Sequence, residues 1–260
     1  MPSLVGSEMC IRDRDLTDST PKAGTIIYNS LDKLTNQIAE ENTGDVLKFD
    51  YAKHPHVIKN GTTYLIHDKK EYQIPFFGEH NLINVNAAKV VCDRLCITNE
   101  DFYKAISSFK GAKNRLEEIV SNTERKVFKD FAHSPSKLKA TCDAVKTQFK
   151  NPLIAVFEMH TYSSLTKSFL NEYKSTLKNV DFPFVYFNPE VLKHKNLPEI
   201  SIEEVSNAFG IQKENIFTDS KALENNLKTI AQAQNKANIL LMSSGNFDGL
   251  ELENLAKELL

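Results

Sequence analysis

The stretch KVFKDFAHSPSKLKATCDAVKTQFKNPLIAVFE, residues 126–158, decides the fold class. It predicts a strand at 127–131, a helix at 136–149 and a second strand at 153–158. The second strand is a continuous apolar run, which is typical of a strand covered on both faces. A strand, a helix and a strand in this order indicate one βαβ unit of a parallel sheet.

The same alternation continues to the end of the chain. Further strands are predicted at 183–187, 215–218 and 239–242, with helices at 164–177, 201–209, 221–235 and from residue 250 onward. The sequence therefore predicts an α/β fold whose C-terminal part is a Rossmann-like, doubly wound parallel sheet.

A different pattern precedes this part. It contains a strand at 24–28, a helical pattern at 30–41, four short strand-like runs up to residue 75 with an Asn60-Gly61 hairpin signal, and helices at 81–95 and 98–109. The charged stretch 113–124 is expected to form an inter-domain passage. We therefore predict two domains, residues 15–118 and 119–260.

The first fourteen residues, MPSLVGSEMCIRDR, lack the apolar centre of a signal peptide. They resemble translated sequencing-adapter read-through, so residues 1–14 are expected to be non-native. The alternative is a disordered natural terminus.

Composition excludes several classes of protein. A net charge of -2 without a basic stripe gives no indication of nucleic-acid binding, and no apolar run approaches the length of a membrane span. Cys92 and Cys96 have no second Cys/His pair at finger-like spacing, so no metal site is expected. Free thiols without a secretory segment favour a cytoplasmic protein, and a monomer is expected.

Polar residues follow four of the predicted strands, and the carboxyl ends of parallel strands meet at one edge, where ligands bind. The four loops are DFAHSP (130–135), EMHTYSS (158–164), TDS (218–220) and SSGNFD (243–248). Each loop alone has a structural reading, since a sequence such as Ser134-Pro135-Ser136 is a good helix start. Four loops at one edge favour a polar binding site.

Three catalytic signatures are absent from the sequence. It contains no Gly-x-x-x-x-Gly-Lys-Ser/Thr phosphate-binding loop, no Gly-x-Gly-x-x-Gly dinucleotide fingerprint and no Gly-x-Ser-x-Gly nucleophile elbow.

Four segments resemble motifs of the Mur ligase family, in family order and at family spacing. GEHNLIN (78–84) with Ala87-Ala88 resembles the family's Gly-x-His-Asn-x-x-Asn-x-x-Ala-Ala helix start. GAKNRLE (111–117) resembles its Gly-x-x-x-Arg-x-Glu passage. DFAHSP (130–135) resembles its Asp-Tyr/Phe-Ala-His-His-Pro motif, and FEMHTYSS (157–164) resembles the next strand-end loop.

This resemblance implies that residues 15–118 are the tail of an ATP-binding central α/β domain and that 119–260 are the family's last domain. It also implies an ATP-dependent amide-forming ligase of peptidoglycan precursor synthesis or recycling. ATP would convert the carboxylate of UDP-N-acetylmuramate into an acyl phosphate, which an amino acid or cell-wall peptide attacks. ATP and magnesium are the implied cofactors, with the magnesium ligands outside this chain. Within the family, the muramate ligases are most similar, above all the recycling type that attaches an L-alanyl-γ-D-glutamyl-diaminopimelate tripeptide.

The resemblance also assigns residues by position. His80, Asn81 and Asn84 would lie against the adenine, Arg115 and Asp130 would hold the ribose and phosphate side, and His133 and His160 would be catalytic. The incoming amino component would contact the residues of the later loops: His160, Thr161, Ser164, Ser243, Ser244, Gly245 and Asn246.

Two departures from the family pattern bear on the substrate. Ser134 replaces the family's second histidine, which leaves the role of that position open. Thr161 and Ser164 replace arginines of the alanine-adding enzyme, and the loss of two cations favours a larger peptide over a free amino acid.

Three functions stay open at this point. The first is a truncated ligase that is inactive alone because the phosphate-binding loop is absent. The second is a non-catalytic module that binds muropeptides, and the third is another ligase of the superfamily, such as a folate-glutamate type.

Overall fold

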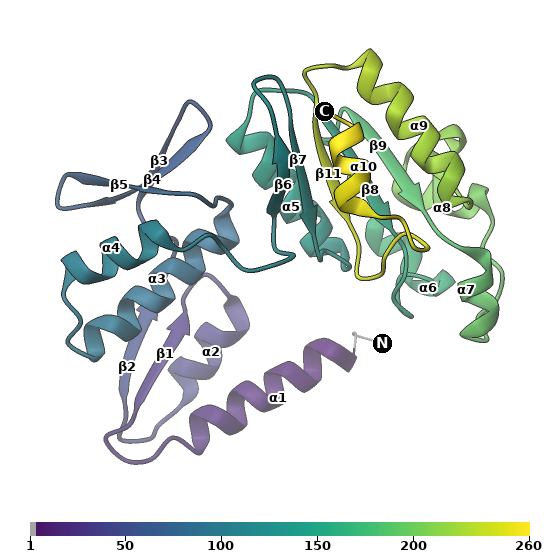
Figure 1. Ribbon diagram of the computed structural model, residues 1–260. Coiled ribbons are helices and arrows are strands. Elements are labelled where there is room, and N and C mark those ends of the chain that lie inside the picture. Colours follow the sequence, from purple (N-terminus) through teal and green to yellow (C-terminus); the bar gives the residue numbers. More distant parts are fainter. Residues whose placement is uncertain (1–3) are drawn as a thin grey trace. The chain divides into compact units, whose positions relative to one another are not determined.

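The computed structural model describes residues 4–260, with side chains from residue 11 onward (Figure 1). The chain divides into two compact units, Met1–Phe109 and Lys110–Leu260. The division falls nine residues before the predicted domain boundary at residues 118 and 119. The assignment of residues 110–118 to a central domain stays a prediction.

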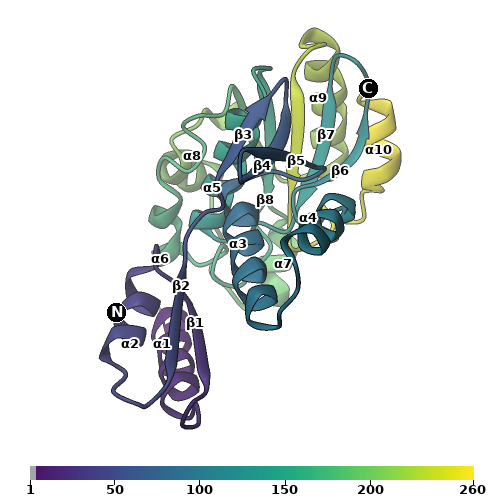
Figure 2. The ribbon, with the colours of Figure 1, turned by 90° about the vertical axis from the view of Figure 1, so that its left-hand side faces the viewer.

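The first unit contains a small βαβ element. Strands β1 (Thr25–Asn29) and β2 (Leu47–Tyr51) pair in parallel and are joined by α2 (Lys33–Glu41). Helix α1 (Leu4–Asp18) packs beside α2 (Figure 2). Residues 4–14 are therefore helical here, and their non-native origin stays a prediction.

An antiparallel meander forms the rest of this unit, with helices packed on it. The Asn60-Gly61 pair sits at the β3–β4 turn with positive φ at both residues, as the hairpin signal predicts. The core consists of Leu65, Ile74, Phe76, Leu82, Val85, Phe102 and Tyr103. The elements are β3 (His56–Lys59), β4 (Thr62–His67), β5 (Lys70–Ile74), α3 (Glu79–Arg94) and α4 (Asn99–Ser108).

The second unit is built on a six-stranded sheet of order β10-β9-β8-β11-β7-β6. All neighbouring strands are parallel except β6 and β7, so the predicted doubly wound parallel sheet is confirmed. The strands are β6 (Glu117–Ser121), β7 (Lys126–Asp130), β8 (Leu153–Glu158), β9 (Phe182–Tyr186), β10 (Ile216–Phe217) and β11 (Asn238–Met242).

Strand β6 lies where a charged passage is predicted, so the prediction for residues 117–121 is wrong. Its charges are those of an edge strand: Glu118 pairs with Lys126 at 2.7 Å and Glu117 with Lys129 at 3.7 Å. Its apolar residues Ile119 and Val120 pack against the core of the sheet.

Most of the helices that cover the sheet lie at nearly the predicted positions. The prediction of a single helix at 164–177 is wrong. Side-chain hydroxyls of Ser164 and Thr166 hydrogen-bond to backbone oxygens in a turn that precedes α6. Further along, Ser175 adopts a positive φ of 63°, which a helix does not allow. Helix α7 was not predicted. The helices are α5 (Pro135–Gln148), α6 (Lys167–Leu170), η1 (Asn171–Tyr173), α7 (Pro189–His194), α8 (Ile202–Phe209), η2 (Lys213–Asn215), α9 (Ser220–Ala233) and α10 (Leu252–Glu258).

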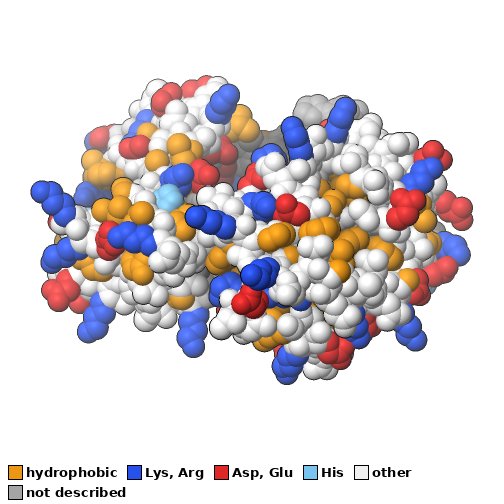
Figure 3. All heavy atoms as spheres, turned by 90° about the horizontal axis from the view of Figure 1, so that it is seen from above, with side chains coloured by type: hydrophobic (Ala, Val, Ile, Leu, Met, Phe, Trp, Pro, Cys, Tyr) orange, Lys and Arg blue, Asp and Glu red, His pale blue; other side chains and the backbone are white. Residues whose placement is uncertain are grey.

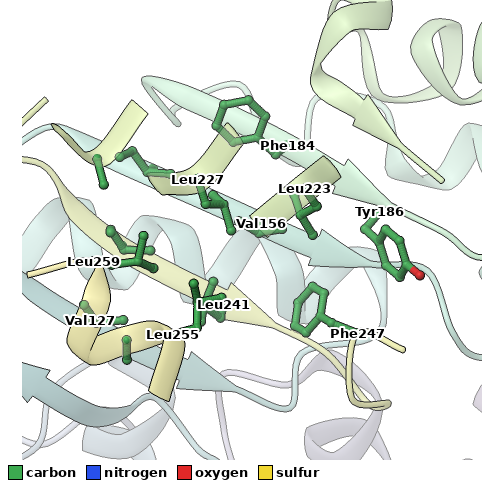
Figure 4. Packing of buried hydrophobic residues seen from close by; sticks show 14 of the residues in the cluster. Val127, Val156, Phe184, Tyr186, Leu223, Leu227, Leu241, Phe247, Leu255 and Leu259 are labelled. Carbon is green, nitrogen blue, oxygen red and sulfur yellow. The ribbon is translucent and has the colours of Figure 1, made fainter. Parts of the chain in front are cut away.

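Both faces of the central strands are buried. On one face, side chains of neighbouring strands such as Val156 and Leu241 pack against Leu227 of α9 and Leu255 of α10 (Figure 4). On the other face, the ring of Phe157 lies among aromatic side chains of η1 and α8. With both faces buried, the polar groups of this sheet gather beyond the strand ends.

Candidate functional site

The carboxyl ends of β8 and β11 lie side by side, since Phe157 pairs with Met242. The next residues, Glu158 and Ser243, are therefore neighbours. The Glu158 side chain is 4% exposed, and its Oε2 accepts hydrogen bonds from Ser243 Oγ and, at 2.9 Å, from the Phe247 N–H. Ser243 Oγ in turn accepts from the Gly245 N–H at 2.6 Å, which draws residues 243–247 into a tight loop.

His160 joins this cluster from the loop after β8. Its Nδ1 lies 3.7 Å from Glu158 Oε1, and its side chain is 37% exposed. Gly245 lies so close that an added Cβ would stand 2.8 Å from His160 Nδ1 and 2.9 Å from Glu158 Oε2. Lys195 Nζ donates to the backbone oxygen of His160 at 2.5 Å, which fixes the main chain at this point. The structure thus brings together the predicted residues His160, Ser243 and Gly245.

Thr161 and Ser164 form the turn that follows His160. Thr161 Oγ1 accepts from the Ser164 N–H at 3.1 Å, and Ser164 Oγ donates to the Thr161 carbonyl oxygen at 2.9 Å. Ser164 is 1% exposed, so its hydroxyl holds the turn. A substrate contact by either residue stays a prediction.

Ser244 and Asn246 occupy the opposite loop. The Ser244 hydroxyl is buried and has no hydrogen-bond partner among the described residues, whereas Asn246 is exposed and its Oδ1 accepts from the Gly249 N–H at 3.2 Å.

The end of β7 supplies the third part of this edge. Asp130 is 7% exposed, and its carboxylate accepts from the Leu116 N–H at 2.7 Å and from Thr141 Oγ1 at 3.3 Å. Its backbone oxygen accepts from the Ser243 N–H at 3.0 Å, which joins β7 to the loop after β11. Arg115, next to Leu116, has its guanidinium 5.4 Å from the centre of the Phe131 ring.

His133 lies after β7 and is half-buried. Because a carbonyl oxygen can only accept, its Nδ1 donates to the Phe131 oxygen at 2.9 Å. Its own backbone oxygen accepts from the Tyr173 hydroxyl at 2.9 Å. Burial raises the pKa of Tyr173, so this hydroxyl remains a donor throughout the physiological range. Both contacts fix His133 and leave Nε2 for other partners.

The remaining predicted residues belong to the first unit. His80, Asn81 and Asn84 lie on the first turns of α3, after Gly78, whose φ of 97° suits glycine. Asn81 Nδ2 donates to the Phe77 oxygen at 2.7 Å. His80 and Asn81 are half-buried and Asn84 is exposed.

Among residues 11–260, whose side chains are described, there is no group of three or more His, Cys, Asp or Glu side chains placed to hold a metal ion. In the same range, no helix combines the length and apolar character needed to cross a membrane. Figure 3 shows acidic and basic side chains scattered over the face that it presents.

Sequence reasoning placed Glu158 in a loop of the site without giving it a role. The available signal was a carboxylate at the last position of a strand whose other five residues are apolar. Lys195 was missed altogether, since it follows the unpredicted helix α7.

Residues 114–245, just over half of the chain, match the family described as "Mur ligase, glutamate ligase domain". The chain belongs to the Mur ligase family. The resemblance found in the sequence motifs is thereby confirmed at the level of the family.

Several Mur ligases are similar in sequence. The UDP-N-acetylmuramate--L-alanine ligase of Christiangramia forsetii is 29% identical over 186 residues, which cover 70% of this chain and 39% of that protein. The ligase of the same name from Sulfurihydrogenibium sp. is 28% identical over 93% of this chain and 54% of its own length. The chain thus spans about half the length of its relatives, or less.

Solved structures show the same fold. MurF from Acinetobacter baumannii superposes with a TM-score of 0.71 at 17% identity, covering 97% of this chain and 55% of that one. A murein peptide ligase mpl from Psychrobacter arcticus gives a TM-score of 0.58 at 18% identity, with the same coverage.

Proposed function

We propose that this Mur ligase chain serves an ATP-dependent amide-forming ligase of peptidoglycan precursors, in which the second unit presents the incoming amine. The cluster of Glu158, His160, Ser243 and Gly245 carries the proposal. It places a half-exposed imidazole and a hydroxyl at the strand ends of a Mur ligase domain, where doubly wound sheets bind ligands. An imidazole with a free nitrogen can take the proton that an ammonium must lose before its amine attacks an acyl phosphate.

We propose nucleotide contacts for two groups of residues, each considered within its own unit. In the first unit, His80, Asn81 and Asn84 offer the donors and acceptors that an adenine edge requires. In the second, the Asp130 carboxylate holds the backbone of Leu116 and thereby fixes Arg115, whose guanidinium suits phosphate oxygens. These residue types suit a nucleotide, whereas no cluster of metal-ligating side chains occurs among the described residues. We therefore propose no magnesium ligand in this chain.

For the incoming amine we propose a peptide, as in the recycling muramate ligases. Thr161 and Ser164 are neutral, and their hydroxyls are engaged in a turn, so they offer no cation for a free amino acid's carboxylate. Lys195 Nζ already donates to the backbone of His160. A tripeptide brings contacts beyond this point, which a single amino acid lacks.

The test compares two amines. Isothermal titration calorimetry of the 260-residue chain should detect L-alanyl-γ-D-glutamyl-meso-diaminopimelate at concentrations where L-alanine shows no heat of binding. Tighter binding of L-alanine would reverse the substrate assignment, and binding of neither would remove the amine site.

A ligation assay addresses the competing function. We expect no ATP-dependent joining of UDP-N-acetylmuramate and tripeptide by these 260 residues, because the sequence contains no phosphate-binding loop. Turnover would contradict that expectation. Peptide binding that is indifferent to every nucleotide would favour a non-catalytic muropeptide-binding module. Binding of a folate substrate in place of the peptide would favour the folate-glutamate type.

A further inference from the structure

Glu158 is an isolated buried carboxylate. It ends a strand whose six residues are all buried, and the basic side chain beside it is His160, whose Nδ1 lies 3.7 Å from Oε1. A carboxylate in such a place loses its hydration and needs compensation from hydrogen bonds and charge. Its two oxygens obtain this from different partners.

The two carboxylate oxygens of Glu158 have different neighbours. Oε2 accepts both hydrogen bonds of the loop after β11, from Ser243 Oγ and the Phe247 N–H. Oε1 faces Nδ1 of His160 at 3.7 Å, which is too long for a hydrogen bond, so here the carboxylate acts through its charge. Phe247 is 1% exposed and packs toward Tyr186, so the loop is anchored in the core just beyond these bonds (Figure 4).

We propose that Glu158 is the positioning residue of the amine site. Its charge favours the tautomer of His160 that carries the proton on Nδ1, which leaves Nε2 unprotonated and able to accept from an incoming ammonium. Its other oxygen holds residues 243–247 over the imidazole, where Gly245 leaves no room for a side chain. The tautomer and the loop are therefore set by one carboxylate. This role rests on the proposed function, although the tautomer itself does not.

Two substitutions separate the two effects. In Glu158→Gln, the amide oxygen replaces Oε2 toward the two loop donors, and the amide NH₂ group then faces Nδ1 of His160. A donor at that position favours the opposite tautomer, with the proton on Nε2, while the loop is kept. Ser243→Ala removes the hydroxyl that donates to Glu158 Oε2 and accepts from the Gly245 N–H, and it leaves the carboxylate facing the imidazole. It should therefore loosen the loop and keep the tautomer.

The measurement is ¹⁵N NMR of the histidine-labelled 260-residue chain at about pH 8, where imidazoles are mostly neutral. The His160 signals are assigned by their loss in His160→Asn. We expect the Nδ1–H tautomer in the wild type and in Ser243→Ala, and the Nε2–H tautomer in Glu158→Gln. Backbone amide signals of Gly245 and Phe247 should move in Ser243→Ala more than in Glu158→Gln. Glu214→Gln, at an exposed carboxylate of the same unit, is the matched control and should change neither.

Binding of the tripeptide L-alanyl-γ-D-glutamyl-meso-diaminopimelate supplies the functional readout. Glu158→Gln should weaken the binding of the tripeptide about tenfold, because an interaction with a charged group is removed. Glu214→Gln should leave the binding of the tripeptide unchanged.

Each outcome decides one claim. An Nε2–H tautomer in the wild type, or an unchanged tautomer in Glu158→Gln, overturns the positioning role. So does an inverted tautomer with tripeptide affinity within about twofold of the wild type. If the wild type binds no amine, the proposed function fails, and the tautomer still reports whether Glu158 sets the imidazole.

Discussion

Arg125 should be a highly sensitive position in the second unit. It precedes β7, is 3% exposed and donates to four backbone oxygens, those of Ala231, Gln234, Ala237 and Leu259. Three of them lie at the C-terminal ends of α9 and α10, where helix dipoles concentrate negative charge. No carboxylate pairs with this guanidinium among the described residues, and burial lowers the pKa of Arg125.

Arg125→Met keeps the apolar stem and removes every donor. The loss of one hydrogen bond from a charged donor costs about 1.5–3 kcal/mol of stability. The four bonds come from one guanidinium, so their contributions to stability are not additive. Relief from burying a charge offsets part of the loss. We therefore expect a loss of about 3–5 kcal/mol in the free energy of unfolding, and a smaller loss for Arg125→Lys, which keeps the charge without the planar fork.

The assay is native-state hydrogen exchange of the β11 amides, which reports the second unit without interference from unfolding of the first. Lys178→Met, at an exposed position, is the control and should change the free energy of exchange by less than about 0.5 kcal/mol. A loss below about 1 kcal/mol in Arg125→Met would refute the reasoning, because four buried carbonyl groups would then have tolerated the removal of their donor.

Two further predictions follow from single contacts. Gly245→Ala should weaken tripeptide binding at least about tenfold, measured by calorimetry, because its Cβ would stand 2.8 Å from the His160 ring. Asp248→Asn, at an exposed position of the same loop, is the control and should have a smaller effect. Burial lowers the pKa of His54, so protonation favours the unfolded first unit. The stability that His54 contributes is complete above the ordinary imidazole pKa of about 6.5 and is lost as pH falls through the lower folded pKa. The free energy of exchange of the β4 amides, corrected for the pH dependence of the intrinsic exchange rate, should therefore fall on acidification, and His54→Gln should flatten this dependence. An unchanged pH profile in His54→Gln would contradict the assignment.

The sheet of the second unit was predictable because its inner strands β8 and β11 contain continuous apolar runs. The runs at β8 and β11 are too short for buried helices and are bounded by polar loops, so their type and position follow from the sequence. Strand β6 was not predictable in the same way. In the sequence alone, Glu117 and Glu118 are typical of a solvated linker. Only the structure shows that they pair with Lys126 and Lys129 of the neighbouring strand.

The location of the site was predictable from the sequence, but its hydrogen-bond partners were not. Polar residues after parallel strands must share an edge, so His160 and Ser243 could be grouped without a structure. The role of Glu158 depends on Ser243 and Phe247, which lie 85 and 89 residues further along the chain. Local sequence carries no information about such partners, and a carboxylate at a strand end is ordinarily solvated.

Asp130 and Glu158 perform related tasks at the ends of β7 and β8. Each is buried, and each accepts a backbone N–H from a distant loop, that of Leu116 for Asp130 and that of Phe247 for Glu158. The neighbouring histidines, His133 and His160, remain partly exposed. A carboxylate that already accepts from the backbone has fewer lone pairs left for a ligand, whereas an imidazole held at one nitrogen keeps its other nitrogen available. The buried acids therefore set the geometry of this edge, and the histidines are the groups through which it can meet a ligand.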